Sequence, residues 1–167
     1  MWLAKDLLFG FRSQVRIGSY SYIWLLDEDA GLATLDLARM LTLVRESHAS
    51  IVTPAFVNTR FTPEAVAASR AKTPTRIGVD ATGGVGCQTG EPMCEFQLPH
   101  TDCRYRYANS VEVSFPLITP AALYQVLVMC RSCLPMRDST WGLNRVWCAV
   151  AAAQTFGLSE RSCAIID

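Results

Sequence analysis

The sequence predicts a single α/β domain with a mixed, mainly parallel sheet flanked by helices. Residues 22–26 are a run of apolar residues typical of a buried strand, residues 35–47 have a helical period, and residues 51–52 form a second short strand. A strand, a helix and a second strand in this order favour parallel pairing of the two strands, because a crossover helix brings the chain back to the starting edge. The length of 167 residues suits one domain with one core.

Composition excludes several classes of protein. Hydrophobic residues make up 50% of the chain and charged residues 18%, as expected for a folded globular protein. The 15 basic and 15 acidic residues cancel, which argues against a general nucleic-acid partner. No apolar run reaches the roughly 20 residues needed to cross a bilayer, so we expect no membrane segment in this chain.

The seven cysteines are odd in number and irregularly spaced. Cys130 and Cys133 alone have a redox-type spacing, but they follow a predicted helix instead of preceding one, so we interpret them as buried structural cysteines. Disulfides or plain thiols are favoured over a zinc site for a second group, because its spacing matches no common zinc motif. That group comprises Cys87, Cys94, His100 and Cys103.

Three carboxylates, Asp27, Glu28 and Asp29, directly follow the first predicted strand. Open α/β sheets bind ligands beyond the carboxyl ends of their strands. If the extended conformation continues, Asp27 and Asp29 point to one side and Glu28 to the other. Two such carboxylates suit a hard cation, Mg²⁺ or Mn²⁺. The alternative is a solvated acidic turn, with Asp29 near the N-terminus of the next helix.

Two helices are expected in the first third of the chain. Residues 2–11 predict a short amphipathic helix with Leu3, Leu7 and Leu8 on one face. The helix at residues 35–47 has Thr34 as its expected N-cap. Its predicted buried stripe consists of Leu37, Met40, Leu41 and Val44.

Residues 58–109 are the least regular part, with a helix start at Thr62 and a strand at residues 76–79. The glycine run at residues 83–86 is followed by no helix, so a dinucleotide-binding motif is rejected and a loop over a sheet edge is expected. Alternation then predicts a strand at residues 111–115, with Val111, Val113 and Phe115 facing inward and Glu112 facing the other side.

Two helices and a strand complete the expected order. Thr119 and Pro120 are a typical N-cap and first helical residue. Helical periodicity then predicts one buried stripe of Leu123, Val126, Leu127 and Cys130, and a second of Leu143, Val146, Trp147 and Val150. Residues 163–167 form the last predicted strand, which ends on Asp167.

Several segments, taken in collinear order, resemble a known family. They are WLAK before SYSYIWLLDEDAG, TPAF at residues 53–56, VEVSFPLITPAAL at 111–123, WGLN at 141–144 and the closing CAIID. The chain is similar to the plant-type family labelled lysine-ketoglutarate reductase trans-splicing related, which looks like a nucleotide-sugar transferase of the GT-A type. The resemblance covers most of the chain outside residues 58–109, and it implies a Rossmann-like sheet with a carboxylate metal motif.

The resemblance assigns candidate roles by position. The metal motif falls on the acidic cluster, with Asp27 and Asp29 as expected ligands of Mn²⁺ or Mg²⁺. The acidic strand residue of the family falls on Glu112, and its tryptophan–glycine motif, expected to contact substrate, falls on Trp141 and Gly142. As alternatives without a catalytic role, Glu112 would cap a strand face and Trp141 would belong to the core.

Two departures from the family pattern bear on catalysis. The acid expected two residues after the glycine is Asn144 here, and an amide cannot take a proton from an acceptor hydroxyl. Glu112 or Asp167 would then orient or deprotonate the acceptor, or Asn144 would simply cap the last helix. The family pattern also begins with an upstream strand and continues to a downstream histidine, so we expect a fragment or a shortened member, truncated at its N-terminus.

These observations predict metal-dependent glycosyl transfer from a nucleotide-sugar donor to an acceptor that the sequence does not specify. A binding or scaffold module that keeps the fold without the chemistry is the alternative, since fold alone does not decide function. Asn144 favours the module, and the intact acidic cluster favours the enzyme. The resemblance implies the secretory pathway (Golgi) if an upstream anchor exists, and the cytoplasm otherwise.

Overall fold

The computed structural model describes residues 2–28, 30–56, 75–80, 85–90, 103–108, 110–130, 132–134, 143–153 and 161–167. The helical elements in this part of the chain are α1 (Trp2–Phe9), the 3-10 helix η1 (Ile17–Ser19), α2 (Leu37–Ser47), α4 (Pro120–Tyr124), the π-helix η3 (Gln125–Met129) and α5 (Leu143–Ala152). The strands are β1 (Ile23–Trp24), β2 (Ile51–Pro54), β3 (Thr75–Asp80), β4 (Val85–Gly90), β5 (Cys103–Ala108), β6 (Leu117–Ile118) and β7 (Cys163–Ile166).

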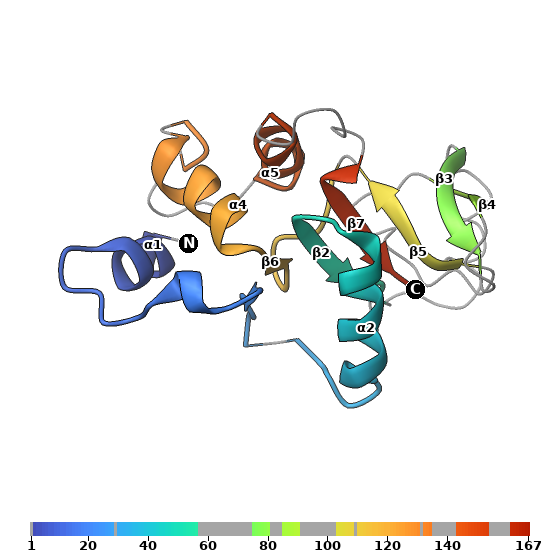
Figure 1. Ribbon diagram of the computed structural model, residues 1–167, viewed down its shortest axis with the longest axis horizontal. Helices are drawn as coiled ribbons and strands as arrows, with labels where there is room; N and C mark the ends of the chain where they lie inside the picture. Colours follow the sequence, from blue (N-terminus) through green and yellow to red (C-terminus); the bar gives the residue numbers. More distant parts are fainter. Residues whose placement is uncertain are drawn as a thin grey trace.

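The described strands form one mixed sheet in the order β1-β6-β2-β7-β5-β3-β4. Helix α2 lies on one side of this sheet, and α4 and α5 lie on the other (Figure 1). The predicted α/β character is therefore confirmed, with helices on both faces.

The prediction of a mainly parallel sheet is wrong. Among the described pairings, β2 with β7 is the parallel one, and the others are antiparallel. Strand β6 lies between β1 and β2 and runs antiparallel to both, so β1 and β2 share a direction without pairing. The β3–β4 pair needs no crossover, because antiparallel strands can be joined by a short connection.

Strand β1 was expected to be buried on both faces, and it is instead half-buried at the edge of the sheet. Its neighbour Leu26 is 46% exposed. Backbone pairing continues beyond the strand, since Leu25 N–H donates to the Pro116 carbonyl at 3.0 Å and Asp27 N–H donates to the Ser114 carbonyl at 2.9 Å. An edge strand has only one neighbour to cover it, which explains the exposure.

The core on the α4 and α5 side confirms most of the stripe predicted for the helix that begins at Pro120, while Cys130, its last member, follows the π-helix and is only partly buried. Thr119 caps the helix as expected, accepting a hydrogen bond from Ala122 N–H. The buried stripe consists of Leu123, Val126 and Leu127, each at most 1% exposed. In α5, Trp147 is fully buried as predicted, whereas Val146 is 38% exposed.

The core on the α2 side differs in detail from the prediction. Asp36, not Thr34, caps α2 by accepting a hydrogen bond from Arg39 N–H at 2.9 Å. Met40 and Val44 are buried as expected, but Leu37 lies in the first turn and is 47% exposed. The helix ends at His48, which adopts a left-handed conformation with φ 53°.

The stretch expected to be irregular, residues 58–109, contains strands β3, β4 and β5. The strand predicted at residues 76–79 is confirmed by β3, whereas the loop predicted after the glycine run becomes β4 from Val85 onward. The helix start predicted at Thr62 lies outside the described residues.

The cysteines of two described pairs form disulfides and are not free thiols. Cys130 is bonded to Cys133, and Cys148 is bonded to Cys163. Cys103 is disulfide-bonded too, in agreement with a disulfide or thiol in place of a zinc ligand. The Cys148–Cys163 bond joins α5 to the central strand β7, and both of its cysteines are buried.

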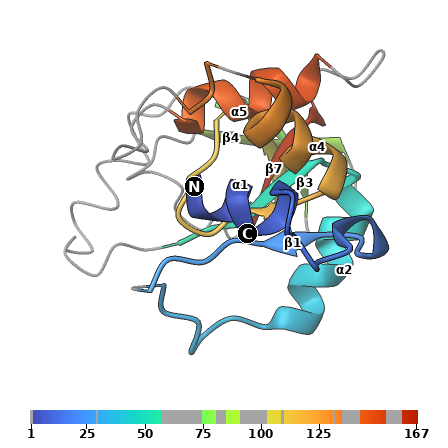
Figure 2. The same cartoon turned by 90° about the vertical axis from the view of Figure 1, so that its left-hand side faces the viewer.

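The face predicted for the first helix, Leu3, Leu7 and Leu8, meets the core only at Leu8. Leu3 and Leu7 are exposed, whereas Ala4, Leu8 and Phe9 pack against the core beneath α4 and the π-helix. Figure 2, seen from the end of the molecule that carries α1, shows this helix in front of the sheet. Within the described residues, no helix is both long enough and apolar enough to cross a membrane.

Candidate functional site

Three of the predicted site residues lie at one edge of the sheet. Strands β1, β2 and β7 run in the same direction, so their carboxyl ends share this edge. Asp27 lies just beyond β1, and Asp167 lies just beyond β7. Glu112 belongs to the segment that leads into the antiparallel strand β6, which brings it to the same edge. We call this edge, with Asp27, Glu112 and Asp167, the acidic edge.

Asp27 has a fixed backbone and an exposed side chain. Its N–H donates to the Ser114 carbonyl, and its own carbonyl accepts a hydrogen bond from Ala30 N–H at 3.2 Å. The chain therefore turns after Asp27, and the extended run that would align Asp27 with Asp29 does not continue. Aspartate is common at the first position of such turns. Asp29 itself lies outside the described residues.

Glu112 hydrogen-bonds to its own local backbone. Its Oε1 atom accepts from Val113 N–H at 2.8 Å, from Ser114 N–H at 3.3 Å and from the Ser114 hydroxyl at 3.2 Å. The strand predicted at residues 111–115 is not formed, because these side-chain bonds compete with strand pairing. Val111 and Val113 are nevertheless buried, as the alternation predicted.

Ser114 links the two acidic positions, and sequence reasoning missed it. Its carbonyl accepts from Asp27, while its N–H and hydroxyl both donate to Glu112. The structure therefore brings Asp27 and Glu112 together across a single residue. Serine side chains often form local hydrogen bonds, so the serine two residues after Glu112 was the available signal.

An aromatic pair lies beside these carboxylates. Phe56 follows β2 and meets Phe115 edge to face, with ring centroids 5.0 Å apart. The Trp24 indole donates to the Phe115 carbonyl at 3.0 Å, which fixes the segment before β6. The acidic edge thus has half-buried aromatic surface next to exposed negative charge, a combination that can contact both the apolar and the polar parts of a ligand.

Asp167 is in a different environment from Asp27. Its carboxylate Oδ1 lies 3.5 Å from the Arg106 guanidinium, and the two side chains are 0% and 4% exposed. A buried carboxylate is tolerated only when it is paired in this way. Sequence reasoning missed Arg106, for which the alternating arginines and tyrosines at residues 104–107 were the available signal.

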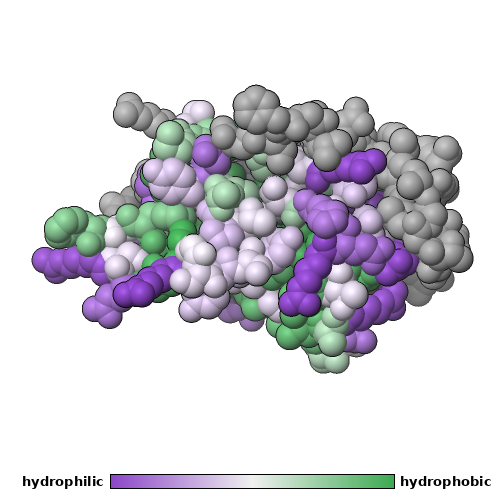
Figure 3. All heavy atoms as spheres, in the orientation of Figure 1, coloured by the Kyte–Doolittle hydropathy of each residue, from purple (hydrophilic) through white to green (hydrophobic). Residues whose placement is uncertain are grey.

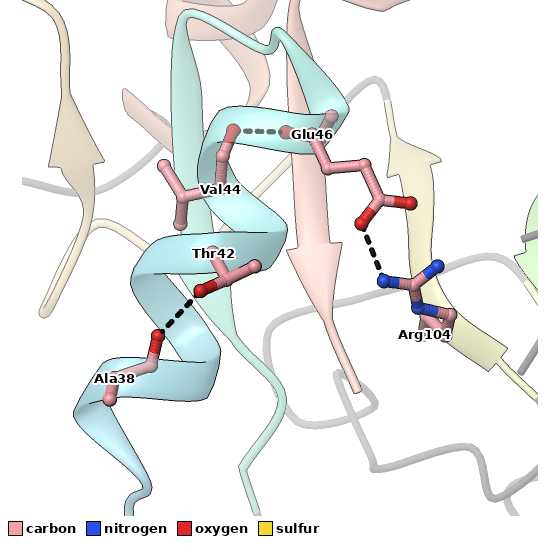
Figure 4. A network of polar contacts seen from close by, with 6 residues as sticks. Ala38, Thr42, Val44, Glu46 and Arg104 are labelled. Atoms are coloured by element: carbon pink, nitrogen blue, oxygen red, sulfur yellow. Dashed lines mark hydrogen bonds and ion pairs between the residues drawn. The ribbon is translucent and has the colours of Figure 1, made fainter.

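Arg104, next to this pair, ties the sheet to helix α2. Figure 4 shows its guanidinium meeting the Glu46 carboxylate of α2. Its carbonyl accepts a hydrogen bond from Asp167 N–H at 3.0 Å. Burial, reinforced by Tyr107, raises the pKa of the neighbouring Tyr105 to about 12. These contacts hold β5 against α2 and β7.

The side chains of the other predicted site residues lie outside the part of the chain that the structure describes. Asn144 lies in the first turn of α5, and its side chain is not described. Trp141 and Gly142 lie outside the described residues.

The acidic edge carries oxygen atoms of the type that bind hard cations. Asp27, Glu112 and Ser114 supply carboxylate and hydroxyl oxygens, which Mg²⁺ and Mn²⁺ prefer. Among the described residues, no three histidine, cysteine or acidic side chains are grouped closely enough to hold a metal ion. Two of the oxygen-bearing groups are already bonded to each other, so a cation bound here would need further ligands beside Asp27.

Comparisons with protein-family models, with curated proteins and with solved structures found no match to this chain.

Proposed function

We propose that this chain binds a nucleotide-sugar donor through a divalent cation and transfers the sugar to an acceptor. The observation that supports this function is the position of Asp27, which is exposed at the carboxyl edge of the sheet and tied through Ser114 to Glu112. Ligands of α/β sheets bind at this edge, and transfer from a sugar diphosphate requires positive charge there.

In the proposed complex, Asp27 and Asp29 hold Mn²⁺ or Mg²⁺. The cation would neutralise the diphosphate leaving group of the donor. Asp27 suits this role, because its backbone is anchored and only its side chain needs to be ordered. The half-buried rings of Phe56 and Phe115 offer an apolar surface beside it.

A GT-A-like fold is part of the same proposal. It is supported by strand β1 and helix α2 leading to β2, with the acidic cluster directly after β1.

A second candidate function, a binding module without transfer, is favoured by the environment of Asp167. Its carboxylate is buried and paired with Arg106, so deprotonating an acceptor would require this ion pair to open. Asn144, as an amide, cannot act as a base. Glu112 is then the remaining predicted base, and its Oε1 atom already accepts three hydrogen bonds.

Calorimetric titration with Mn²⁺, in the presence and absence of uridine diphosphate, tests the proposal. We expect wild-type protein to bind Mn²⁺ with micromolar to millimolar affinity and more tightly with the nucleotide. The Asp27→Ala variant should lose this binding, since a hard cation depends on its carboxylate ligands. Asp6→Ala is a matched control, because Asp6 is an exposed acid on α1, away from the acidic edge.

Equal Mn²⁺ affinity in wild type and Asp27→Ala would remove the metal site from the proposal. If binding behaves as expected, donor hydrolysis and transfer in Mn²⁺ distinguish the two candidates. A transferase releases uridine diphosphate from the donor, whereas a binding module retains the donor without releasing it.

A further inference from the structure

Helix α1 has apolar side chains on both of its faces. One face, formed by Ala4, Leu8 and Phe9, packs on the core, and Phe9 meets Tyr124 edge to face at 5.5 Å. The other face carries Leu3 and Leu7, which are 71% and 59% exposed. Large apolar side chains exposed next to one another often mark an interaction surface, and Leu3 and Leu7 have no cover within the described structure.

The outer apolar face continues beyond the helix. Phe11 is 106% exposed, and Val15 is 46% exposed. Both residues lie beyond the end of α1 at Phe9, so they extend the exposed apolar surface along the chain and not as a helical stripe. Gly10 allows the chain to leave the helix here, because a Cβ atom at this position would lie 2.2 Å from the Asp6 carbonyl oxygen. We call Leu3, Leu7, Phe11 and Val15 the outer apolar face.

Positive charge accompanies this face. Residues 2–16 contain Lys5, Arg12 and Arg16 and a single acid, Asp6, in a chain whose overall net charge is zero. Both arginines are exposed. Figure 3 shows hydrophobic and strongly hydrophilic side chains side by side at the end of the molecule that carries α1.

We propose that the outer apolar face of α1 binds an anionic membrane surface. Segments with apolar residues on one side and lysine or arginine beside them lie in the interface of a bilayer without crossing it. Leu3, Leu7 and Phe11 insert between the acyl chains and the headgroups. Arg12 and Arg16 contact the anionic headgroups, which attract basic residues close to the surface.

The charge of the segment favours a membrane over a second copy of this chain. In a two-fold dimer the same patch meets itself, so Arg12 and Arg16 of one copy would face the same positive patch of the other. Like charges placed against each other oppose association. An anionic bilayer complements both the apolar and the basic parts of the segment.

Co-sedimentation with vesicles tests this proposal. Wild-type protein should pellet with vesicles of phosphatidylcholine and phosphatidylserine, and remain in the supernatant with vesicles of phosphatidylcholine alone. The binding should weaken as salt is raised, because salt screens the headgroup charge. Each arginine near an anionic surface contributes about fivefold in affinity, so Arg12→Gln with Arg16→Gln should weaken binding by roughly thirtyfold.

The apolar part is tested with Leu7→Gln and Phe11→Ser combined. Loss of two inserting side chains should weaken binding by about a hundredfold or more. The control is Leu32→Gln with Leu37→Gln, since these leucines are exposed apolar residues outside α1, at 40% and 47%. Circular dichroism should show unchanged secondary structure in all three variants, so that lost binding reflects the surface and not the fold.

Three results would overturn the proposal. The first is wild-type protein that stays in the supernatant with anionic vesicles. The second is unchanged vesicle binding in the Leu7→Gln, Phe11→Ser variant. The third is a concentration-dependent dimer in sedimentation equilibrium that this variant abolishes, because it would assign the outer apolar face to a second copy.

Discussion

Glu112 and Asp36 both accept hydrogen bonds from backbone amides slightly further along the chain, with opposite effects on local structure. The Asp36 carboxylate accepts a hydrogen bond from Arg39 N–H and caps the start of helix α2, because the first amides of a helix have no partner within it. The Glu112 carboxylate accepts hydrogen bonds from the N–H groups of Val113 and Ser114, and the strand predicted at residues 111–115 is interrupted there. The side chain of a single residue thus decides whether the backbone begins an element or leaves one.

Tyr105 shows how a single buried group makes the fold depend on pH. It is 5% exposed and lies edge to face against Tyr107, with ring centroids 5.7 Å apart. Burial is the largest cause of its raised pKa, about 12 against an ordinary value of 10.0, and the neighbouring Tyr107 and Glu46 raise it further. The fold therefore favours the neutral phenol.

We predict that the protein loses stability in alkali as Tyr105 ionises. The folded-state pKa lies above the unfolded value, so the stabilising contribution is complete below pH 10.0 and is lost as the pH rises to about 12. Urea unfolding at increasing pH should show the free energy of unfolding falling over this window. In Tyr105→Phe, which has no ionisable hydroxyl, the fall should be smaller. An identical pH profile in the variant would show that Tyr105 does not cause the loss.

At the scale of elements, periodicity predicts a helix more securely than it predicts which face is covered. The stripe at Leu123, Val126 and Leu127 is buried as expected, because α4 and the π-helix lie directly on the sheet. Leu3 and Leu7 of the predicted α1 stripe are exposed instead, and only Leu8 packs against the core, although the period is equally regular. Apolar residues occupy both faces of α1, so its sequence does not indicate which face meets the core.

Strand pairing is predicted less well, because it depends on residues far apart in the sequence. The last strand was predicted from its apolar run, whereas its antiparallel partner β5 lay in a region expected to be irregular. Strand β6 has two residues and pairs with β1 and β2 at once. No local pattern indicates that an antiparallel strand separates two strands joined by a helix.

In the candidate site too, contacts between residues far apart in the sequence were not predicted. The sequence predicted that the first and last strands each end on an acid, and the structure has Asp27 and Asp167 beyond the carboxyl ends of strands that run in the same direction. Their environments were not predictable, because Arg106, which buries and pairs with Asp167, comes from β5. The contact of Asp27 with Ser114 likewise depends on β6 pairing with β1.

A pair of leucines tests which helical residues stabilise the fold. Leu127 is 1% exposed and Leu37 is 47% exposed, although periodicity placed both in buried stripes. Leu127→Ala should lower the free energy of unfolding by roughly 2–5 kcal/mol, since it leaves a cavity in the core. Leu37→Ala should change it by about 0.5 kcal/mol or less, as exposed substitutions do. Chemical denaturation of the two variants measures the difference, and similar losses in both would mean that the core is assigned wrongly.

At the scale of the whole molecule, the sheet separates two apolar clusters that share its central strands. Ile51 and Ile165 belong to the cluster beneath α4 and α5, and Val52 and Ala164 belong to the cluster beneath α2. Successive residues of a strand point to opposite faces, so β2 and β7 contribute to both clusters. A covalent link and an ionic link also join the helices to the sheet. The Cys148–Cys163 bond ties α5 to β7, and Glu46 of α2 pairs with Arg104 of β5.

The two intact disulfides between described residues should contribute unequally to stability. Cys148 and Cys163 are separated by 15 positions, and Cys130 and Cys133 by 3. A cross-link restricts the unfolded chain more when it closes a longer loop, so removing the first should cost about 3 kcal/mol and removing the second about 2 kcal/mol. Burial adds to this difference, because Cys148 and Cys163 are both core residues, whereas Cys130 is partly exposed.

Double alanine variants of each pair, compared by chemical denaturation, measure these contributions. Exposure also predicts an order of reduction in the native protein, since exchange requires a thiolate to reach a sulfur atom. A thiol reductant should open Cys130–Cys133 before Cys148–Cys163, and labelling of the released thiols identifies which bond has opened. If Cys148–Cys163 opens first, or if its removal costs less than removal of Cys130–Cys133, then the disulfide is not what holds α5 to β7. Its apolar contacts and the hydrogen bond from the Ser162 hydroxyl to the Cys148 carbonyl must then anchor the helix.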